Sequence, residues 1–332
     1  MSLYNKHRPK KFDDIVGNAA SINAIKFRLM ENKLPNALLF YGPSGTGKTT
    51  IARIIGLIVN CSNLENNVPC LKCSNCSSIL SGNNPDFMEI NAADIRGIDS
   101  IRSIIGKMMY SPTYLPNRVI ILDEAHSLTN EAQNCLLKPL EEPPSNNYLM
   151  LCTTEPDKLL KTVRNRCDKH ELSSLSNSER TRLVKSVLQK ESVTLSDETI
   201  KAFTQECSSS PRDLLNQLDS LLSQEEPDSI ETVMAVLNIF DEDVVDSTAI
   251  NVARALAYKP NEVRNLAKNL EPGMNYEGYR RLILSYVKKC LLSAKDIKSE
   301  ERFIKIIESF MSPLEYSAAD LDFICRLYRL SK

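Results

Sequence analysis

The segment Gly42–Thr49 constrains the fold of this chain more than any other part of its sequence. It reads Gly-Pro-Ser-Gly-Thr-Gly-Lys-Thr and fits the pattern G-x-x-x-x-G-K-[ST]. The apolar run Ala37–Tyr41 before it predicts a buried strand, and the pattern of Lys48–Val59 after it predicts a helix. In this setting, glycines let backbone N–H groups turn inward around phosphate oxygens at the positive end of the helix. The segment therefore predicts a phosphate-binding loop and not a chance Gly-rich turn.

Two acidic residues complete the prediction of an ATP and Mg²⁺ site. Asp123 and Glu124 directly follow the apolar run Arg118–Leu122. We expect Asp123 to hold Mg²⁺ through its water shell and Glu124 to polarise the attacking water. Lys48 is expected to reach the β- and γ-phosphates, and the Thr49 hydroxyl to complete the Mg²⁺ shell. The residues of the loop predicted to bind the nucleotide are Gly42, Pro43, Ser44, Gly45, Thr46, Gly47, Lys48, Thr49 and Thr50.

The order of the apolar runs predicts an α/β fold. Runs that read as strands alternate with helical patterns, which favours a parallel five-stranded sheet with helices on both faces. Besides Ala37–Tyr41, the predicted strands are Phe87–Ile90, Arg118–Leu122, Tyr148–Cys152 and Lys169–Leu172.

Helical patterns alone follow Leu172, and a chain of 332 residues is long enough for two or three domains. The predicted helices are Asn177–Glu191, Ser196–Cys207 with Ser196 as its N-cap, and Pro211–Ser223. Residues Gln224–Pro227 read as a linker. We therefore predict an ATP-binding domain over residues 1–172, a helical lid over 173–226 and an all-helical domain over 227–332.

Four of the ten cysteines lie close together, at Cys61, Cys70, Cys73 and Cys76. Four thiolates within residues 61–76 are enough for a closed, structural Zn²⁺ site with no position left for water. Ligand type alone leaves an iron–sulfur cluster open, and four free thiols are the other alternative. The other six cysteines are scattered among apolar or helical neighbours, which indicates buried thiols and not a disulfide framework.

Composition excludes some classes of protein. The sequence has no apolar run of about 18 residues and its N-terminus lacks the apolar core of a signal peptide, so we expect an intracellular protein without a membrane partner. Lys and Arg (41) nearly balance Asp and Glu (42). The protein therefore has no overall positive field that would indicate binding to nucleic acid, and any DNA contact requires a local arrangement of basic residues.

Two stretches of the sequence resemble a known protein family. The runs VIILDEAHSLTNEAQNCLLKPLEEPP and KHRPKKFDDIVGN resemble AAA+ ATPases of the clamp-loader group. The chain is similar to bacterial DNA polymerase III tau/gamma subunits and to the small subunits of replication factor C over about residues 1–222. The tau/gamma subunits carry a similar zinc module, which replication factor C subunits generally lack. The resemblance therefore favours a cytoplasmic protein of a bacterial or phage-infected cell, associated with the nucleoid through DNA.

The resemblance implies roles for further residues. Arg8 and Pro9 match an N-terminal element that lines the adenine pocket together with Val16 and Gly17, although His7 stands where the family usually has Tyr. Arg166, in Asn-Arg-Cys instead of the usual Ser-Arg-Cys, matches an arginine finger that acts on ATP held by the neighbouring subunit. Two positions match nucleotide sensors, namely Thr153 near the γ-phosphate and Arg212 on the lid.

A DNA contact is implied by the resemblance of Arg96, Gly97 and Ile98 to the Arg-Gly-Ile-Asp element of replication factor C. That element opens a helix that lines the central channel and contacts the DNA backbone. Arg96 and the N–H groups at the helix start are expected to bind a phosphate. The alternative is an ordinary exposed helix start. Gln133 and Lys138, on the helix after the acidic pair, are in a position to relay DNA occupancy to Glu124, but Pro139 interrupts that helix pattern.

The resemblance thus implies an ATPase subunit of a sliding-clamp loader that works in a hetero-oligomer, a pentameric ring. The implied partners are the other loader subunits, the sliding clamp and primer–template DNA, and residues 227–332 become the oligomerisation collar. ATP binding opens the clamp and favours DNA binding, and hydrolysis releases the loaded clamp. Two alternatives stay open: a related AAA+ ATPase of DNA recombination or branch migration, and a loader subunit that binds nucleotide without hydrolysing it.

Overall fold

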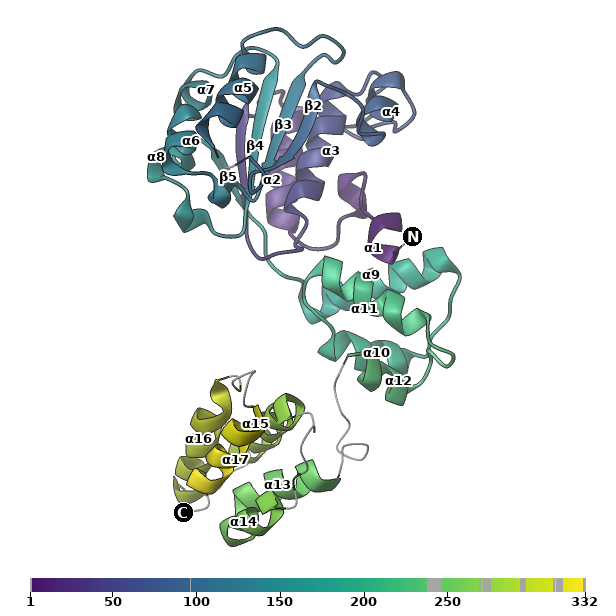
Figure 1. Cartoon of the computed structure of the whole chain (residues 1–332). Helices are drawn as coiled ribbons and strands as arrows, with labels where there is room; N and C mark the ends of the chain where they lie inside the picture. The colour runs from purple at the N-terminus through teal and green to yellow at the C-terminus, as the bar shows by residue number, and fades with distance from the viewer. Residues whose placement is uncertain are drawn as a thin grey trace. The chain divides into compact units, whose positions relative to one another are not determined.

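A computed structural model describes residues 2–95, 97–237, 247–268, 270, 276–292, 297–312, 314 and 319–330. The chain forms two compact units, Met1–Leu237 and Asn238–Lys332 (Figure 1). No helix among the described residues is both long enough and apolar enough to cross a lipid bilayer.

A parallel sheet of five strands forms the centre of the first unit, in the order β2-β3-β4-β1-β5. Its three inner strands are almost wholly apolar and buried, as expected for a parallel sheet covered on both faces. The predicted α/β fold is therefore confirmed. The strands are β1 (Ala37–Tyr41), β2 (Phe87–Asn91), β3 (Arg118–Asp123), β4 (Asn147–Thr153) and β5 (Asp168–Glu171).

Alternate residues of the inner strands face two separate cores, because successive side chains of a strand point to opposite faces. Leu38 and Phe40 pack with α2 (Ala19–Met30) and α3 (Lys48–Asn60). Leu39 packs instead with helices on the other face, which Figure 1 shows opposite α2 and α3. These helices are α5 (Ile98–Met108), α6 (Asn130–Cys135), α7 (Leu137–Glu141) and α8 (Lys161–Arg164).

The helix after β3 is broken, as Pro139 predicts. Helix α6 ends at Cys135 and α7 begins at Leu137, so Pro139 lies in the first turn of α7, where a missing N–H costs no hydrogen bond. Gln133 is buried, donates to the Leu128 carbonyl at 3.1 Å and accepts from the Leu160 N–H at 2.7 Å. Its amide thereby connects α6 to the segment before α8.

Four helices build the lid, and the first is held by a capping box between Ser176 and Glu179. Ser196 caps the second helix as predicted, accepting from the Thr199 N–H at 3.2 Å. Val233 of the fourth helix is completely buried in the lid core. The predicted third domain, residues 227–332, thus begins with a helix that packs on the lid. The four helices are α9 (Asn177–Glu191), α10 (Asp197–Glu206), α11 (Pro211–Leu222) and α12 (Ile230–Val236).

The described residues of the second unit form helices around an aromatic core that contains Phe303, Phe310 and Phe323. Buried Arg280 donates to the Phe310 carbonyl at 2.6 Å, and buried Arg326 to the Ser312 carbonyl at 2.8 Å. Cations at these carbonyls stabilise the C-terminal end of a helix. The helices are α13 (Ser247–Tyr258), α14 (Pro260–Lys268), α15 (Tyr276–Leu292), α16 (Ile297–Met311) and α17 (Ala319–Leu330).

Candidate functional site

A cavity of the first unit collects most of the predicted nucleotide-binding residues. It lies where β1 and β3 end and is lined by the loop, the acidic pair, the N-terminal segment and the lid. Gly17, Gly42 and Pro43 are not among its lining residues, although they adjoin it in the chain. The predicted residues that line it are Arg8, Pro9, Val16, Ser44, Gly45, Thr46, Gly47, Lys48, Thr49, Thr50, Asp123, Glu124 and Arg212.

Two glycines of the loop allow a close approach of other backbone and of the lid. Gly42 has a φ of +141°, and a Cβ added there would lie 2.0 Å from the Leu172 carbonyl oxygen. Gly45 has a φ of +74°, and its added Cβ would lie 2.1 Å from Ser210 Oγ at the start of α11. Backbone conformation disfavours a side chain at both positions, and at Gly42 the Leu172 backbone excludes it by sterics as well, whereas the atom that meets Gly45 is a side-chain hydroxyl.

Lys48 lies inside the curve of the loop. Its Nζ donates to the carbonyl oxygens of Gly42, at 2.9 Å, and Pro43, at 2.8 Å. Burial lowers the pKa of Lys48, while the nearby Glu124 and Asp123 carboxylates act in the opposite direction. The ammonium group is therefore held in place by neutral carbonyl groups that an anionic phosphate can replace.

Thr49 and Asp123 form an oxygen-rich pair suited to a hard cation. The Thr49 hydroxyl donates to Asp123 Oδ2 at 2.8 Å, and the Glu124 N–H donates to Asp123 Oδ1 at 3.0 Å. Hydroxyl and carboxylate oxygens are the ligand types that Mg²⁺ takes beside phosphate and water. The residues present therefore fit Mg²⁺ bound together with a nucleotide.

The structure does not bring Thr153 into the cavity lining. Thr153 is fully buried, and its hydroxyl lies 3.0 Å from His126 Nδ1 and accepts from the Glu155 N–H at 3.0 Å. The next residue, Thr154, instead donates to Glu124 Oε2 at 3.4 Å. His126 Nδ1 also lies 3.4 Å from that oxygen. Thr154 and His126 are thus neighbours of Glu124 that the sequence analysis did not single out.

Arg212 reaches the cavity from the first turn of α11. Its Nη2 donates to the Tyr4 hydroxyl at 3.3 Å, and its Cζ lies 5.1 Å from the centre of the Tyr4 ring. This hydrogen bond is the main cause that raises the pKa of Arg212. Tyr4 lines the same cavity and was also missed, because nothing in its local sequence marks it as a neighbour of the lid.

Arg166 lies outside the cavity, on the surface after α8. Its Nε donates to Glu141 Oε1 at 2.7 Å, its Nη2 contacts the same oxygen, and its Nη1 donates to the Thr162 carbonyl at 2.9 Å. Arg166 is therefore not among the described residues that line the cavity.

Comparisons with known sequences find subunits of DNA polymerase III. The sequence model of the family described as DNA polymerase III, delta subunit, matches residues 17–176. The chain is 34% identical over 222 residues to DNA polymerase III subunit tau of Bacillus subtilis (strain 168), covering 67% of this chain and 39% of that protein. It is 36% identical over 217 residues to DNA polymerase III subunit gamma of Buchnera aphidicola subsp. Schizaphis graminum, covering 65% of this chain and 60% of that protein. The resemblance to DNA polymerase III clamp-loader subunits is confirmed.

The sequence matches cover only part of each relative. The chain spans 39% and 60% of the length of these two relatives, respectively. A solved structure with a similar fold is the RuvB Holliday junction branch migration motor of Thermotoga maritima, with a TM-score of 0.52 and 18% identity, covering 86% of this chain and 91% of that one. At this identity the likeness shows the fold alone.

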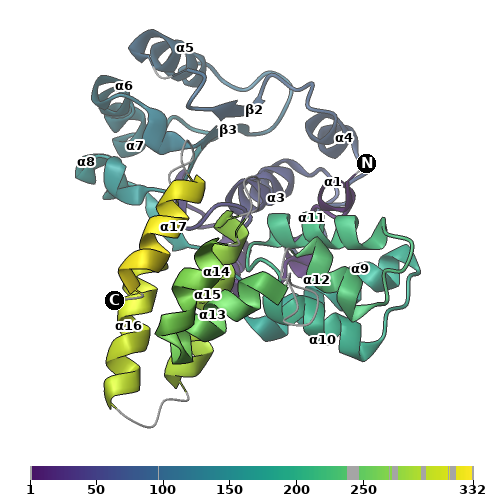
Figure 2. The ribbon, with the colours of Figure 1, turned by 60° about the horizontal axis from the view of Figure 1, so that its bottom comes forward.

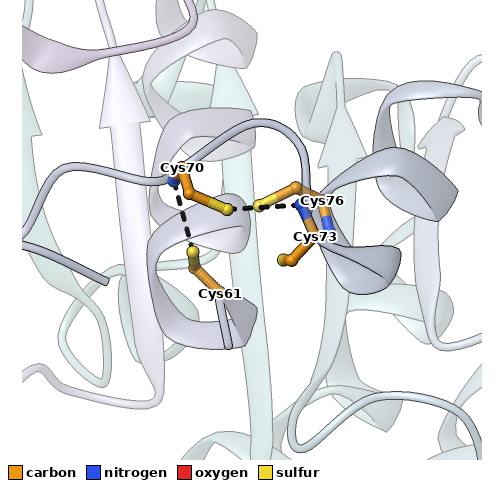
Figure 3. Close-up of side chains that lie close together, drawn as sticks. All are labelled: Cys61, Cys70, Cys73 and Cys76. Atoms are coloured by element: carbon orange, nitrogen blue, oxygen red, sulfur yellow. Dashed lines mark hydrogen bonds between the residues drawn. The ribbon is translucent and has the colours of Figure 1, made fainter. Parts of the chain in front are cut away.

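The four clustered cysteines of the chain converge on one point (Figure 3). Their Sγ atoms lie within 4.8 Å of one another. The N–H groups of Cys70 and Cys73 each donate at 3.3 Å to the sulfur of the preceding cysteine, and the Cys76 N–H donates to Cys73 Sγ at 3.4 Å. The hydrogen bond from the Cys76 N–H, together with weaker ones, lowers the pKa of Cys73 to about 6, whereas burial raises the pKa of Cys76. Backbone N–H donors stabilise thiolates, so the residues present fit a tetrahedral metal site.

The structure describes only part of the predicted DNA-contacting element, which consists of Arg96, Gly97 and Ile98. Arg96 falls outside the described residues. Gly97 is the exposed N-cap of α5, and Ile98 is the first residue of that helix. The N–H groups of the first turn of α5 therefore begin at the surface of the first unit.

Proposed function

We propose that this chain is an ATP-hydrolysing subunit of a sliding-clamp loader. The arrangement that supports the proposal most is the separation of Arg166 from the cavity that collects Lys48, Asp123 and Arg212. An ATPase site without an arginine finger is incomplete, so a neighbouring subunit has to supply the arginine. Loader subunits that work as a ring require such an arrangement.

Each residue of the proposed site has a chemical task. Lys48 and Arg212 bind the phosphates, while Thr49 and Asp123 hold Mg²⁺, which neutralises charge on the phosphate oxygens. Glu124 orients the attacking water, and its carboxylate is held by Thr154 and faced by His126. Arg166 stabilises the negative charge that develops in the transition state at the neighbouring subunit.

The proposed cycle converts the binding of ATP into a change of partner affinity. With ATP bound, the subunits close around one another, open the clamp and admit primer–template DNA; hydrolysis then favours release. The exposed start of α5 is a candidate phosphate contact, which contributes affinity and not base choice. Residues 238–332 are the proposed collar through which the subunits assemble, and we place the protein in the bacterial cytoplasm.

The cysteine cluster is proposed as a structural zinc site. It lies between α3 and β2, away from the nucleotide cavity, and four thiolates leave no coordination position for a substrate. Zinc there would fix the fold of the insertion and take no part in hydrolysis.

The two alternatives have less support. Similarity to RuvB is limited to the fold, so it does not favour branch migration. A subunit without turnover has no use for the acidic pair, yet Asp123 and Glu124 adjoin the same cavity as Lys48.

Reconstitution with candidate partners tests the proposal. The purified chain is mixed with candidate loader subunits and a sliding clamp, and capture of the clamp is measured by gel filtration with ATP, with ADP and without nucleotide. We expect a clamp complex with ATP only, and ATP turnover that DNA and clamp together stimulate. Lys48→Ala should lose both. Clamp capture without nucleotide, or unchanged turnover in Lys48→Ala, contradicts the proposed enzymatic role.

Replacement of Gly45 by Ala is expected to weaken ATP binding by about tenfold, because the added Cβ would displace the Ser210 hydroxyl and lie 3.2 Å from Arg212 Cβ, which crowds the start of α11 beside the loop. Titration with a fluorescent ATP analogue measures the effect. Gly82→Ala is the matched control, since Gly82 has the same φ of +74° but no atom within 4 Å of an added Cβ. Equal loss of affinity in both variants would assign the effect to backbone strain and not to the lid.

A further inference from the structure

The N-terminal segment, Ser2–Arg8, is attached to the lid by an apolar and a polar contact. Leu3 of α1 (Leu3–Lys6) is 6% exposed and belongs to the core of the lid. Its N–H donates to Asp219 Oδ2 of α11 at 3.4 Å. Figures 1 and 2 both show α1 beside α11. The first residues of the chain thus pack on the lid, although the sheet that follows them belongs to the ATPase domain.

The same segment makes further contacts with the lid and then reaches the other side of the cavity. Lys6 Nζ lies 2.7 Å from Glu191 Oε2 at the end of α9, and His7 contacts the other oxygen of that carboxylate. Arg8 Nε then donates to the Thr50 hydroxyl of α3 at 3.1 Å. Because Thr50 follows directly on the loop lysine and threonine, Ser2–Arg8 connects the lid with the helix that carries the phosphate-binding loop.

Tyr4 is the residue of this segment that meets Arg212. Its ring centre lies 5.1 Å from the guanidinium carbon, within the range of a cation–π contact, and its hydroxyl accepts from Arg212 Nη2 at 3.3 Å. Both side chains line the nucleotide cavity. A long Arg side chain has many rotamers, and two contacts of different kinds to one rigid ring restrict them.

We propose that Tyr4 is a positioning residue for Arg212, which keeps the guanidinium at the nucleotide cavity so that the protein distinguishes ATP from ADP. The inference rests on the proposed ATP binding. Since Leu3 holds α1 on α11, Tyr4 and Arg212 belong to one packed unit. Arg212 is therefore already oriented before the nucleotide binds, and the terminal phosphate of ATP gains a contact that ADP lacks.

A purely structural role for Tyr4 makes a different prediction. If the Tyr4 ring only anchors α1 or packs on the adenine base of the nucleotide, its loss changes the affinities for ATP and ADP by the same factor. If it acts through Arg212, its loss changes the affinity for ATP more, and the effect disappears once Arg212 is removed.

Nucleotide titrations of the full chain test the proposal with Tyr4→Leu, Tyr4→Phe, Arg212→Ala and the double variant Tyr4→Leu/Arg212→Ala. We expect Tyr4→Leu to weaken ATP binding by about tenfold and ADP binding by less than about twofold. Tyr4→Phe, which keeps the ring and loses the hydroxyl, should fall between. Adding Tyr4→Leu to Arg212→Ala should change neither affinity further. Lys6→Ala, which removes a contact of the same segment at Glu191, should leave the ratio of the two affinities unchanged.

The outcomes separate this inference from the function on which it rests. A wild-type chain that binds ATP, together with a Tyr4→Leu variant of unchanged ATP-to-ADP ratio, overturns the role of Tyr4 alone. The same holds if Tyr4→Leu costs as much in the Arg212→Ala background as in the wild type. A wild-type chain that binds neither nucleotide overturns the proposed function and this inference together.

Discussion

An Arg166→Ala variant, assembled with its partner subunits, is expected to lose at least about three orders of magnitude in ATP turnover at the interface that it serves. The free variant should keep the ATP affinity of the wild-type chain. Both expectations follow from the position of Arg166. It is not among the described residues that line the nucleotide cavity of its own subunit. A finger supplied by a neighbour contributes to the transition state and not to binding of the ground state.

The contact with Glu141 does not prevent this use of Arg166. The two side chains are 31% and 50% exposed, respectively, and a pair of that kind contributes about 0–1 kcal/mol. Exchange of the carboxylate for a phosphate therefore has a small cost. Nε, Nη2 and Nη1 each use one N–H in the free chain, which leaves two of the five N–H groups of a guanidinium for an incoming anion.

Arg164→Ala is the matched control for Arg166→Ala. Arg164 ends α8 and pairs with Asp157 at 2.7 Å, so its loss also removes a surface ion pair beside the same helix. Turnover of the assembled complex, measured by phosphate release with DNA and clamp present, should stay near the wild-type rate. Weaker ATP binding by the free Arg166→Ala chain would show instead that Arg166 acts on its own site.

The nucleotide loop could be predicted from the sequence because one short segment determines both its backbone and its chemistry. Gly42 and Gly45 are required by contacts with Leu172 and Ser210, yet the motif that contains them is local and has a strand before it and a helix after it. The same holds for the acidic pair at the end of β3. Only the alternation of apolar runs was needed to predict the sheet around them.

Other parts of the site depend on tertiary contacts that have no local signal. Tyr4 meets Arg212 only because Leu3 fits the lid core, and the two residues stand 208 positions apart. Thr153 and Thr154 differ in the same way, since neither is among the residues that line the cavity, Thr153 is buried beside His126, and Thr154 donates to Glu124. Two adjacent threonines of the sequence carry no signal for these different contacts. The position of α12 in the lid likewise follows from burial of Val233 and not from its sequence.

Replacement of Cys76 by Ser is expected to abolish metal binding and to unfold the insertion between α3 and β2. The wild-type chain should carry about one zinc ion, since its four sulfurs lie within 4.8 Å of one another and form one closed site. Cys76 is completely buried beside Leu57, Ile79 and Leu115, so loss of the metal also opens this small core. Structural zinc in small peptides binds with an apparent free energy of about 10–16 kcal/mol, more than a core of this size supplies. Plasma emission spectrometry of the purified protein measures the metal.

Cys325→Ser is the control, because Cys325 is exposed on α17 and far along the chain from the cluster. It should keep the wild-type zinc content. Cys76→Ser should still bind ATP, since the insertion follows the C-terminal end of α3 whereas the phosphate-binding loop precedes its N-terminal end. Loss of ATP binding together with the metal would show that the insertion supports the nucleotide site. Iron and sulfide in place of zinc, with absorption in the visible range, would identify the alternative that four thiolates also permit, an iron–sulfur cluster.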